Sequence, residues 1–151
     1  MNFKPLTSII KTILLTALTK TYKIFLPRFT MGTSCLLLNE NNKVYLQKHR
    51  FWPKHSWGFP GGYLKSNESA ENGIIREVFE ESGLKIELIK QITIKKDSKT
   101  HFTIYFLGKI ISSEKFKLQK LEIIDAGFFD ISELPEPILK DHKILIEEIF
   151  S

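Results

Sequence analysis

Three glutamates close together in the sequence are the first residues that could do chemistry: Glu77, Glu80 and Glu81. An α-helix turns about 100° per residue, so they lie at about 0°, 300° and 40° and share one face. Like charges one turn apart repel each other. Bound divalent cations explain such a cluster better than a solvated surface, and ligands that are all oxygen favour magnesium or manganese. Taken alone, the three could still form an ordinary exposed acidic helix.

Arg76 directly precedes these glutamates and is one of only three arginines, beside 19 lysines. Its planar guanidinium can hold carboxylates in a fixed geometry that lysine cannot. We expect Arg76 to orient Glu77 or Glu81, and Glu68 to accept a hydrogen bond from it. The alternative is an ordinary surface ion pair.

The stretch from Gly62 to Leu84 resembles the Nudix box, Gly-x5-Glu-x7-Arg-Glu-U-x-Glu-Glu-x-Gly-U, where U is apolar. Every specified position matches, and a wider likeness runs from about Cys35 to the last helix. The resemblance implies an α/β fold of the Nudix type, an α/β/α sandwich with a mixed sheet. It also implies a magnesium-dependent hydrolase that cleaves a phosphoanhydride bond in a nucleoside diphosphate linked to another group.

The resemblance assigns roles to particular residues. The metal ligands would be the Gly61 carbonyl and three side chains, Glu77, Glu80 and Glu81. A metal-activated water would attack phosphorus. Family members differ in which glutamate acts as the base, so the base stays open here. A later acidic residue often contributes as well; Glu122 is the first candidate and Asp125 the second, and a solvated loop acid is the alternative.

Cations and aromatics precede the box. Lys48 and Arg50 are candidate phosphate contacts, and Trp52 is a candidate for stacking on a base. Trp57 and Phe59 fit better as core residues. The two histidines of this stretch have no metal-ligand partner at suitable spacing, so we expect them to be plain loop residues: His49 and His55.

The box must be positioned by a helix at residues 70–82, which Ser69 can cap and Gly83 can end. Gly73 on the glutamate face allows close approach of another backbone. Three apolar residues should anchor the helix in the core: Ile75, Val78 and Phe79. Strands are expected at residues 35–38, 44–47, 57–59, 86–94, 101–110 and 127–129, and a last helix at about 137–150. We expect Cys35 to be a small buried apolar residue. A single cysteine cannot form an internal disulfide, which fits a protein of the reducing cytoplasm.

Charge divides the chain into an extension, residues 1–30, and a Nudix domain, residues 31–151. Five of the 22 basic residues lie in the extension, which has no acid, and the other 17 balance the 17 acidic ones. A domain without excess positive charge argues against binding DNA and against RNA. Residues 5–26 predict an amphipathic helix, and its apolar run, which Lys11 and Lys20 interrupt, is too short to cross a bilayer. We expect its apolar stripe to pack on the domain or on a second subunit, as in a homodimer; peripheral membrane contact is the less favoured alternative.

The substrate stays open within the nucleotide class. No proline lies about fifteen residues past the box, where ADP-ribose hydrolases tend to have one, and the tyrosine of diadenosine-polyphosphate hydrolases is missing from Ser98–Thr100. Two alternatives remain beside small-molecule hydrolysis. One is removal of pyrophosphate from an RNA 5′ end, and the other is a non-catalytic module that senses a nucleotide, although such a module would be expected to lose the glutamates.

Overall fold

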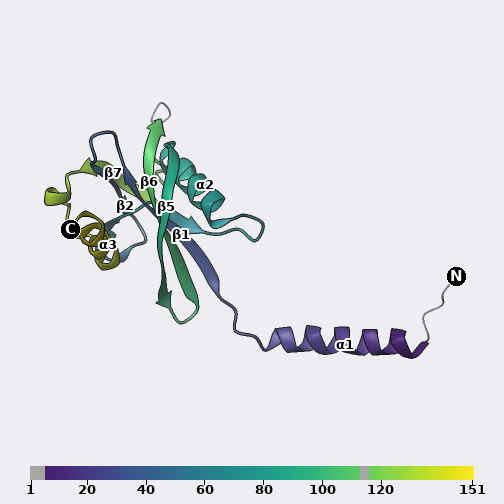
Figure 1. Cartoon of the computed structure of the whole chain (residues 1–151). Coiled ribbons are helices and arrows are strands. Elements are labelled where there is room, and N and C mark those ends of the chain that lie inside the picture. The colour runs from purple at the N-terminus through teal and green to yellow at the C-terminus, as the bar shows by residue number, and fades with distance from the viewer. Residues whose placement is uncertain (1–5, 113–115) are drawn as a thin grey trace.

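The computed structural model describes residues 6–112 and 116–151, in which one mixed sheet lies between two helices (Figure 1). The helices are α1 (Leu6–Ile24), α2 (Ala70–Ser82) and α3 (Lys140–Phe150), with short 3-10 turns at Pro53–His55 and Ile131–Glu133. The strands are β1 (Thr30–Leu38), β2 (Val44–His49), β3 (Trp57–Gly58), β4 (Gly61–Tyr63), β5 (Lys85–Ser98), β6 (His101–Ser112) and β7 (Ile123–Phe129).

The sheet is mixed. Its main path runs β3-β2-β1-β6-β5, with β4 paired to β1 and β7 paired to β2. β1 and β6 are parallel, and the other pairs are antiparallel. Helix α2 covers one face and α3 the other (Figure 1). This is the α/β/α sandwich that the sequence predicted.

Alternation along the strands divides the apolar side chains between two cores. On β1, Leu36 faces the α3 side, whereas Cys35 and Leu37 face the α2 side. Trp57 and Phe59 are buried on the α3 side, as expected. Cys35 is also fully buried, which confirms its prediction as a small core residue. The sheet is thus packed on both faces, and this packing positions the ends of its strands.

Helix α2 has the predicted bounds. The Ser69 hydroxyl accepts a hydrogen bond from the Asn72 N–H at 3.2 Å, and Gly83 ends the helix with φ 71°. The predicted anchors were partly wrong: Val78 is buried, but Ile75 and Phe79 are exposed, and Ile74 is buried instead. The buried face is rotated toward the glutamates, and therefore Glu81 itself points into the protein.

Three other expectations differ from the structure. The hairpin of β5 and β6 is longer than expected, so that residues 95–98 belong to a strand and only Lys99 and Thr100 turn. Strand β4 was not foreseen, because its three residues show no alternation. Helix α3 begins at Lys140 rather than near Pro137, because residues 137–139 bond to Trp57 as a short bridge: the Trp57 N–H donates to the Pro137 carbonyl at 2.7 Å.

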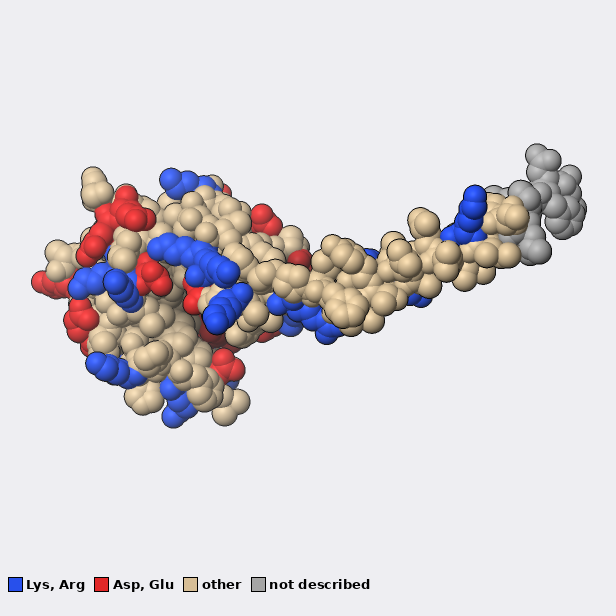
Figure 2. Space-filling view, turned by 90° about the horizontal axis from the view of Figure 1, so that it is seen from below, with Lys and Arg blue, Asp and Glu red and all other residues tan. Residues whose placement is uncertain are grey.

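Helix α1 extends away from the sandwich (Figures 1 and 2). Its described side chains are exposed almost without exception, and none belongs to either core cluster. The predicted helix is therefore present, but the expected packing of its apolar stripe on this domain is not found. No helix among the described residues is long and apolar enough to cross a membrane.

Candidate active site

Before α2, Gly62 leaves room for the Glu77 carboxylate beside strand β4. Gly62 lies in β4, paired with Thr33 of β1. A Cβ at Gly62 would lie 2.5 Å from the carboxyl carbon of Glu77. Any larger residue would therefore displace this carboxylate.

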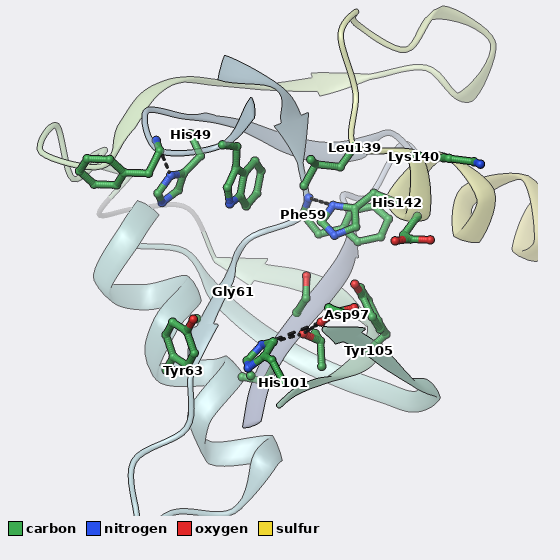
Figure 3. A pocket seen from close by; sticks show the side chains of 18 of the residues that line it. His49, Phe59, Gly61, Tyr63, Asp97, His101, Tyr105, Leu139, Lys140 and His142 are labelled. Carbon is green, nitrogen blue, oxygen red and sulfur yellow. Dashed lines mark hydrogen bonds and ion pairs between the residues drawn. The ribbon is translucent and has the colours of Figure 1, made fainter. Parts of the chain in front are cut away.

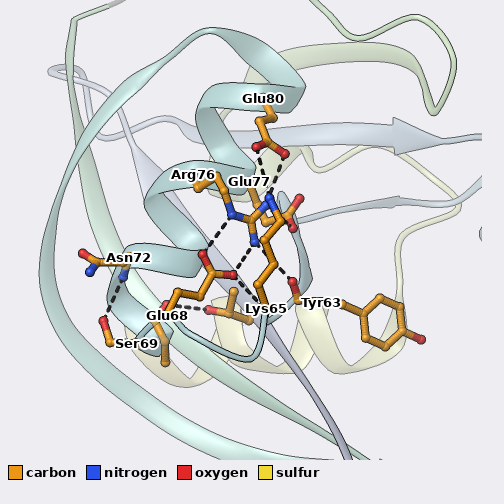
Figure 4. A network of polar contacts seen from close by, with 10 residues as sticks. Tyr63, Lys65, Glu68, Ser69, Asn72, Arg76, Glu77 and Glu80 are labelled. Carbon is orange, nitrogen blue, oxygen red and sulfur yellow. Dashed lines mark hydrogen bonds and ion pairs between the residues drawn. The ribbon is translucent and has the colours of Figure 1, made fainter.

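Arg76 lies at the centre of a polar network on the outer side of α2 (Figure 4). Its Nε and Nη2 donate to both oxygens of Glu68 at 2.9 and 2.6 Å, and its Nη1 donates to Glu77 at 2.7 Å and Glu80 at 3.2 Å. The hydrogen bonds from Arg76 and from the Lys65 N–H lower the pKa of Glu68 to about 2. The expected contact with Glu68 is present, and of the two glutamates proposed for orientation, the arginine contacts Glu77.

Glu81 has a different environment, because it is only 4% exposed. Its Oε2 accepts hydrogen bonds from Gln47 Nε2 at 2.7 Å and from the Gly61 N–H at 3.2 Å. Burial raises the pKa of Glu81 to about 8, and the nearby charges of Glu77 and Glu122 act in the same direction. A positive charge placed next to the Glu81 carboxyl group would therefore strongly favour its ionised form.

Glu122 approaches Glu81 from the loop before β7, and His49 lies beside both. Ligand atoms of the three residues lie within 4.8 Å of one another. His49 is 8% exposed, and its Nε2 lies 3.6 Å from a Glu122 oxygen. Its Nδ1 accepts a hydrogen bond from the Phe51 N–H at 3.2 Å, so a neutral ring carries its proton on Nε2, toward Glu122. Burial lowers the pKa of His49, which favours that neutral ring.

His49 was expected to be a plain loop residue, and this expectation was wrong. It ends strand β2 and lines the site. Spacing could not reveal it, since Glu81 and Glu122 are remote in sequence. Asp125, the second candidate acid, pairs with Lys48 in the β2–β7 ladder and lies outside the pocket lining.

Arg50 is engaged with the loop that carries Glu122. Its Nε donates to the Leu121 carbonyl at 3.1 Å and its Nη2 to the Lys120 carbonyl at 3.4 Å, while its N–H donates to the Glu122 carbonyl at 2.8 Å. The guanidinium is not part of the pocket lining. The structure therefore places Arg50 against the loop and outside the pocket lining.

Lys48 and Trp52 are the other two residues that were expected to contact the substrate. Lys48 Nζ lies 6.0 Å from the centre of the Trp57 ring, outside the pocket lining. Trp52 lines the pocket and stacks on His49, with ring centroids 4.9 Å apart and planes at 22°. The structure thus brings Trp52 to the site, but not Lys48.

A pocket of about 760 Å³ adjoins the carboxylates (Figure 3). Its floor includes Gly61 and Gly62, and His49 and Glu122 border it on one side. Beside small and polar residues, the lining includes several aromatic or imidazole side chains: Phe51, Trp52, Phe59, Tyr63, His101, Tyr105 and His142. Such a lining can enclose a planar, apolar-faced group beside a charged one.

His142 is a pocket residue that the sequence gave no reason to single out. Its Nδ1 accepts a hydrogen bond from the Phe59 N–H at 2.9 Å, and the two rings stack at 4.4 Å. Burial lowers the pKa of His142 to about 3, so the ring is neutral and rigid. It supports the pocket wall from α3.

The donor set suits a hard divalent cation. Glu77 lies against Gly62 and Glu81 accepts a hydrogen bond from the Gly61 N–H, while Glu81 and Glu122 offer ligand atoms within 4.8 Å of each other. Glu80 is held on the same helix by Arg76. Oxygen is the ligand that magnesium and manganese prefer. Gln47 Oε1 is buried beside Glu81 with no hydrogen-bond partner among the described residues. A polar atom left unpaired in a buried site fits an additional polar occupant.

Most of the sequence is similar to known proteins. It matches the NUDIX domain family over residues 28–149. It is 29% identical to an ADP-ribose pyrophosphatase of Methanocaldococcus jannaschii over 119 residues, which is 74% of this chain and 68% of that protein. It is 36% identical to an RNA pyrophosphohydrolase of Psychromonas ingrahamii over 74 residues, but this match spans only 49% of the chain and 38% of the relative.

Among solved structures, a Nudix hydrolase of Nitrosomonas europaea has the same fold, with a TM-score of 0.71 and 23% identity. The match covers 82% of this chain and 73% of that one. With the box, the sandwich and the family match together, the protein belongs to the Nudix family. It is a hydrolase of phosphorus-containing acid anhydrides.

Proposed function

We propose that the protein is a magnesium-dependent pyrophosphohydrolase of a small molecule, a nucleoside diphosphate linked to another group. The observation that carries this proposal is the juxtaposition of buried Glu81 with Glu122 at the edge of an aromatic-lined pocket. A carboxylate cluster suits the phosphates, and the adjoining rings suit a base. The pocket volume lies within the range of small-molecule sites.

The site residues would have different roles in this reaction. Glu77, Glu80 and Glu81, with the Gly61 carbonyl, would hold Mg²⁺ or Mn²⁺. The bound cation would supply charge neutralisation for the phosphates and make a water more acidic. Glu122 and the glutamates of α2 are the groups that can take the proton of this water. Arg76 and Glu68 are positioning residues, because the guanidinium fixes Glu77 and Glu80 and Glu68 fixes the guanidinium.

The aromatic part of the pocket would bind the base. Trp52 presents a ring backed by His49, so it can stack on a planar group without moving. Lys48 and Arg50, outside the lining, would act on the substrate only indirectly. Asp97 and His101 of the β5–β6 hairpin also line the pocket, and their polar atoms can distinguish one base from another.

A product screen tests the proposal. The full chain is incubated with Mg²⁺ and, separately, with nucleoside triphosphates, sugar nucleotides, ADP-ribose, dinucleotides, coenzyme A and 5′-triphosphate RNA. We expect a nucleoside monophosphate from a linked nucleoside diphosphate, with loss of activity in a chelator. Oxygen-18 from water should appear on phosphorus. No turnover of any of these would overturn the proposal in favour of a nucleotide sensor.

RNA pyrophosphate removal is the second candidate, since the relative in Psychromonas ingrahamii bears that name. The neutral charge of residues 31–151 disfavours it, because affinity for nucleic acid depends on phosphate neutralisation by Lys and Arg. Faster release of pyrophosphate from 5′-triphosphate RNA than turnover of every small molecule would establish it instead.

A further inference from the structure

Helix α1 presents a long apolar surface that no part of the described chain covers. Leu15, Leu18 and Phe25 are 68%, 69% and 80% exposed. Globular proteins rarely leave such a continuous apolar surface without an occupant. Most of the stability of a helix in a protein comes from packing of its apolar face, and the described chain offers α1 no such packing.

The apolar surface of α1 is wide. At about 100° per residue, its Ile, Leu and Ala side chains spread over roughly two thirds of the circumference. A narrow polar strip occupies the rest: Ser8, Thr12, Thr16, Thr19 and Lys23. A second helix in a two-stranded coiled coil would cover only a narrow seam. A flat lipid surface can take up a wide arc, with the polar strip facing water.

The hydroxyl groups of α1 are already satisfied inside the helix. Thr12 donates to the Ser8 carbonyl at 2.9 Å, Thr16 to the Thr12 carbonyl at 2.7 Å and Thr21 to the Ala17 carbonyl at 2.9 Å. Such bonds lower the cost of moving a hydroxyl out of water. These threonines therefore do not oppose partial burial in a lipid interface.

The positive charge of α1 favours an anionic partner for its apolar surface. Residues 6–39 carry Lys11, Lys20, Lys23 and Arg28 and no acid, whereas the rest of the chain is close to neutral. Cations along an apolar helix complement anionic headgroups. Lys11 and Lys20 lie within the apolar arc, and their apolar stems can lie along it while their ammonium groups reach the headgroups.

We propose that α1 lies in the surface of an anionic lipid bilayer and holds the Nudix domain beside it. The apolar arc enters the boundary between headgroups and acyl chains, and the lysines contact lipid phosphates. Pro27 and the short segment after α1 connect the bound helix to β1. This inference is independent of the substrate of the hydrolase site.

Vesicle co-sedimentation of the full chain tests the proposal. We expect it to pellet with vesicles that contain phosphatidylglycerol, and far less with pure phosphatidylcholine. Salt near 1 M, where the screening length falls to about 3 Å, should release much of it. Lys20→Glu with Lys23→Glu should weaken partitioning by about tenfold or more, because attraction becomes repulsion.

A matched control has the same net charge change on the domain. Lys85→Glu with Lys90→Glu alters two exposed lysines of β5 and should leave vesicle binding nearly intact. Leu14→Ser with Leu18→Ser should reduce binding without changing charge. The thermal unfolding of the domain should be the same in the α1 variants, since α1 lies outside both cores.

Hydrogen exchange distinguishes a lipid surface from a second copy of the chain. We expect α1 amides to exchange fast in solution and to become protected when anionic vesicles are added. Protection that grows with protein concentration without lipid, together with a dimer in sedimentation equilibrium, would overturn the proposal. So would an equal loss of binding in the β5 control, or no binding to anionic vesicles.

Discussion

Glu81 differs from Glu77 and Glu80 in its surroundings, although the three share one helix face. Glu77 and Glu80 are paired with Arg76, and Glu80 is half exposed. Glu81 is buried, and among the described residues the neutral Gln47 and the Gly61 N–H donate hydrogen bonds to its carboxylate. Its raised pKa means that the folded protein without a cation prefers the protonated form. A bound cation would reverse that preference, so under the proposed function the protonation of Glu81 would be coupled to metal binding.

We predict that Glu81→Gln lowers kcat about a hundredfold or more at saturating Mg²⁺, because it removes a metal-binding charge and keeps the shape. Stability without metal should stay level or rise. A carboxyl whose folded pKa is raised favours folding at low pH and loses that advantage as pH rises from 4.5 through about 8. The glutamine has no such loss. Steady-state kinetics and thermal melts in a chelator check both parts.

The matched control is Glu71→Gln, which removes an exposed acid from the first turn of the same helix. It should keep turnover near the wild-type value. Near-normal turnover in Glu81→Gln as well would contradict the metal assignment.

His142 predicts a pH dependence of stability that is separate from the carboxylates. Its folded pKa of about 3 lies below its ordinary value of 6.5. The stabilising effect is therefore complete above pH 6.5 and is lost as pH falls toward about 3. We expect a slope of up to about 1.4 kcal/mol per pH unit in the unfolding free energy over this window. His142→Asn keeps an acceptor for the Phe59 N–H, and denaturant unfolding at about pH 7 and 5 should show a flatter profile. A variant whose acid slope equals that of the wild type would rule out His142 as its source.

At the scale of elements, the loop before β7 matters because it carries Glu122 to the site. Arg50 ties this loop to the end of β2 through two guanidinium hydrogen bonds to carbonyls. We predict that Arg50→Ala lowers kcat by about tenfold and changes KM less, because a displaced Glu122 acts on the reacting group. Had Arg50 gripped a substrate phosphate, KM would rise instead. Kinetics with the best substrate of the screen separate the two.

Two variants make this test sharper. Arg50→Lys keeps the charge but loses the fork that reaches two carbonyls, so it should resemble Arg50→Ala. Lys48→Ala removes a neighbouring positive charge of β2 and should leave kcat nearly unchanged. Full rescue by lysine would show that charge, and not loop geometry, is what Arg50 supplies.

Elements governed by local chemistry were the ones predicted well. Helix α2 has the expected bounds, because Ser69 and Gly83 give clear start and stop signals. The contact of Arg76 with Glu68 could also be inferred, because both lie in one continuous motif. The resemblance to the Nudix family implied a sheet with two covered faces, which the structure confirms.

Features governed by pairing across the sheet could not be predicted. Gln47 and His49 meet Glu81 only because β2 lies in register with β3 and β7 at the end near α2. A helical wheel gave the relative angles of the α2 residues correctly. It could not say which side faces the sheet, so Phe79 was expected in the core, whereas it is 46% exposed. The same limit applied to Arg50, whose partners are backbone carbonyls.

At the scale of the whole molecule, the chain has two parts with different physical chemistry. The Nudix domain has two apolar cores and a balanced surface, and α1 has exposed apolar residues and positive charge. Their junction lies close to β1. Phe29 packs edge-on against Phe102 with ring centroids 5.4 Å apart, and the Thr30 N–H donates to the Thr100 carbonyl at 2.9 Å. The folded domain therefore includes these residues, although the sequence placed its start at Met31.

We predict that a chain beginning at Pro27 has the melting temperature of the full chain within about 2 °C, because α1 adds nothing to either core. A chain beginning at Met31 should melt several degrees lower, since it lacks the contacts of Phe29 and Thr30 with the β5–β6 hairpin. Scanning calorimetry measures the difference. Both shortened chains should remain monomeric, and neither should pellet with anionic vesicles. A chain from Pro27 that melts well below the full chain would show instead that α1 packs on the domain in solution, and that its exposed apolar surface has a partner within this chain.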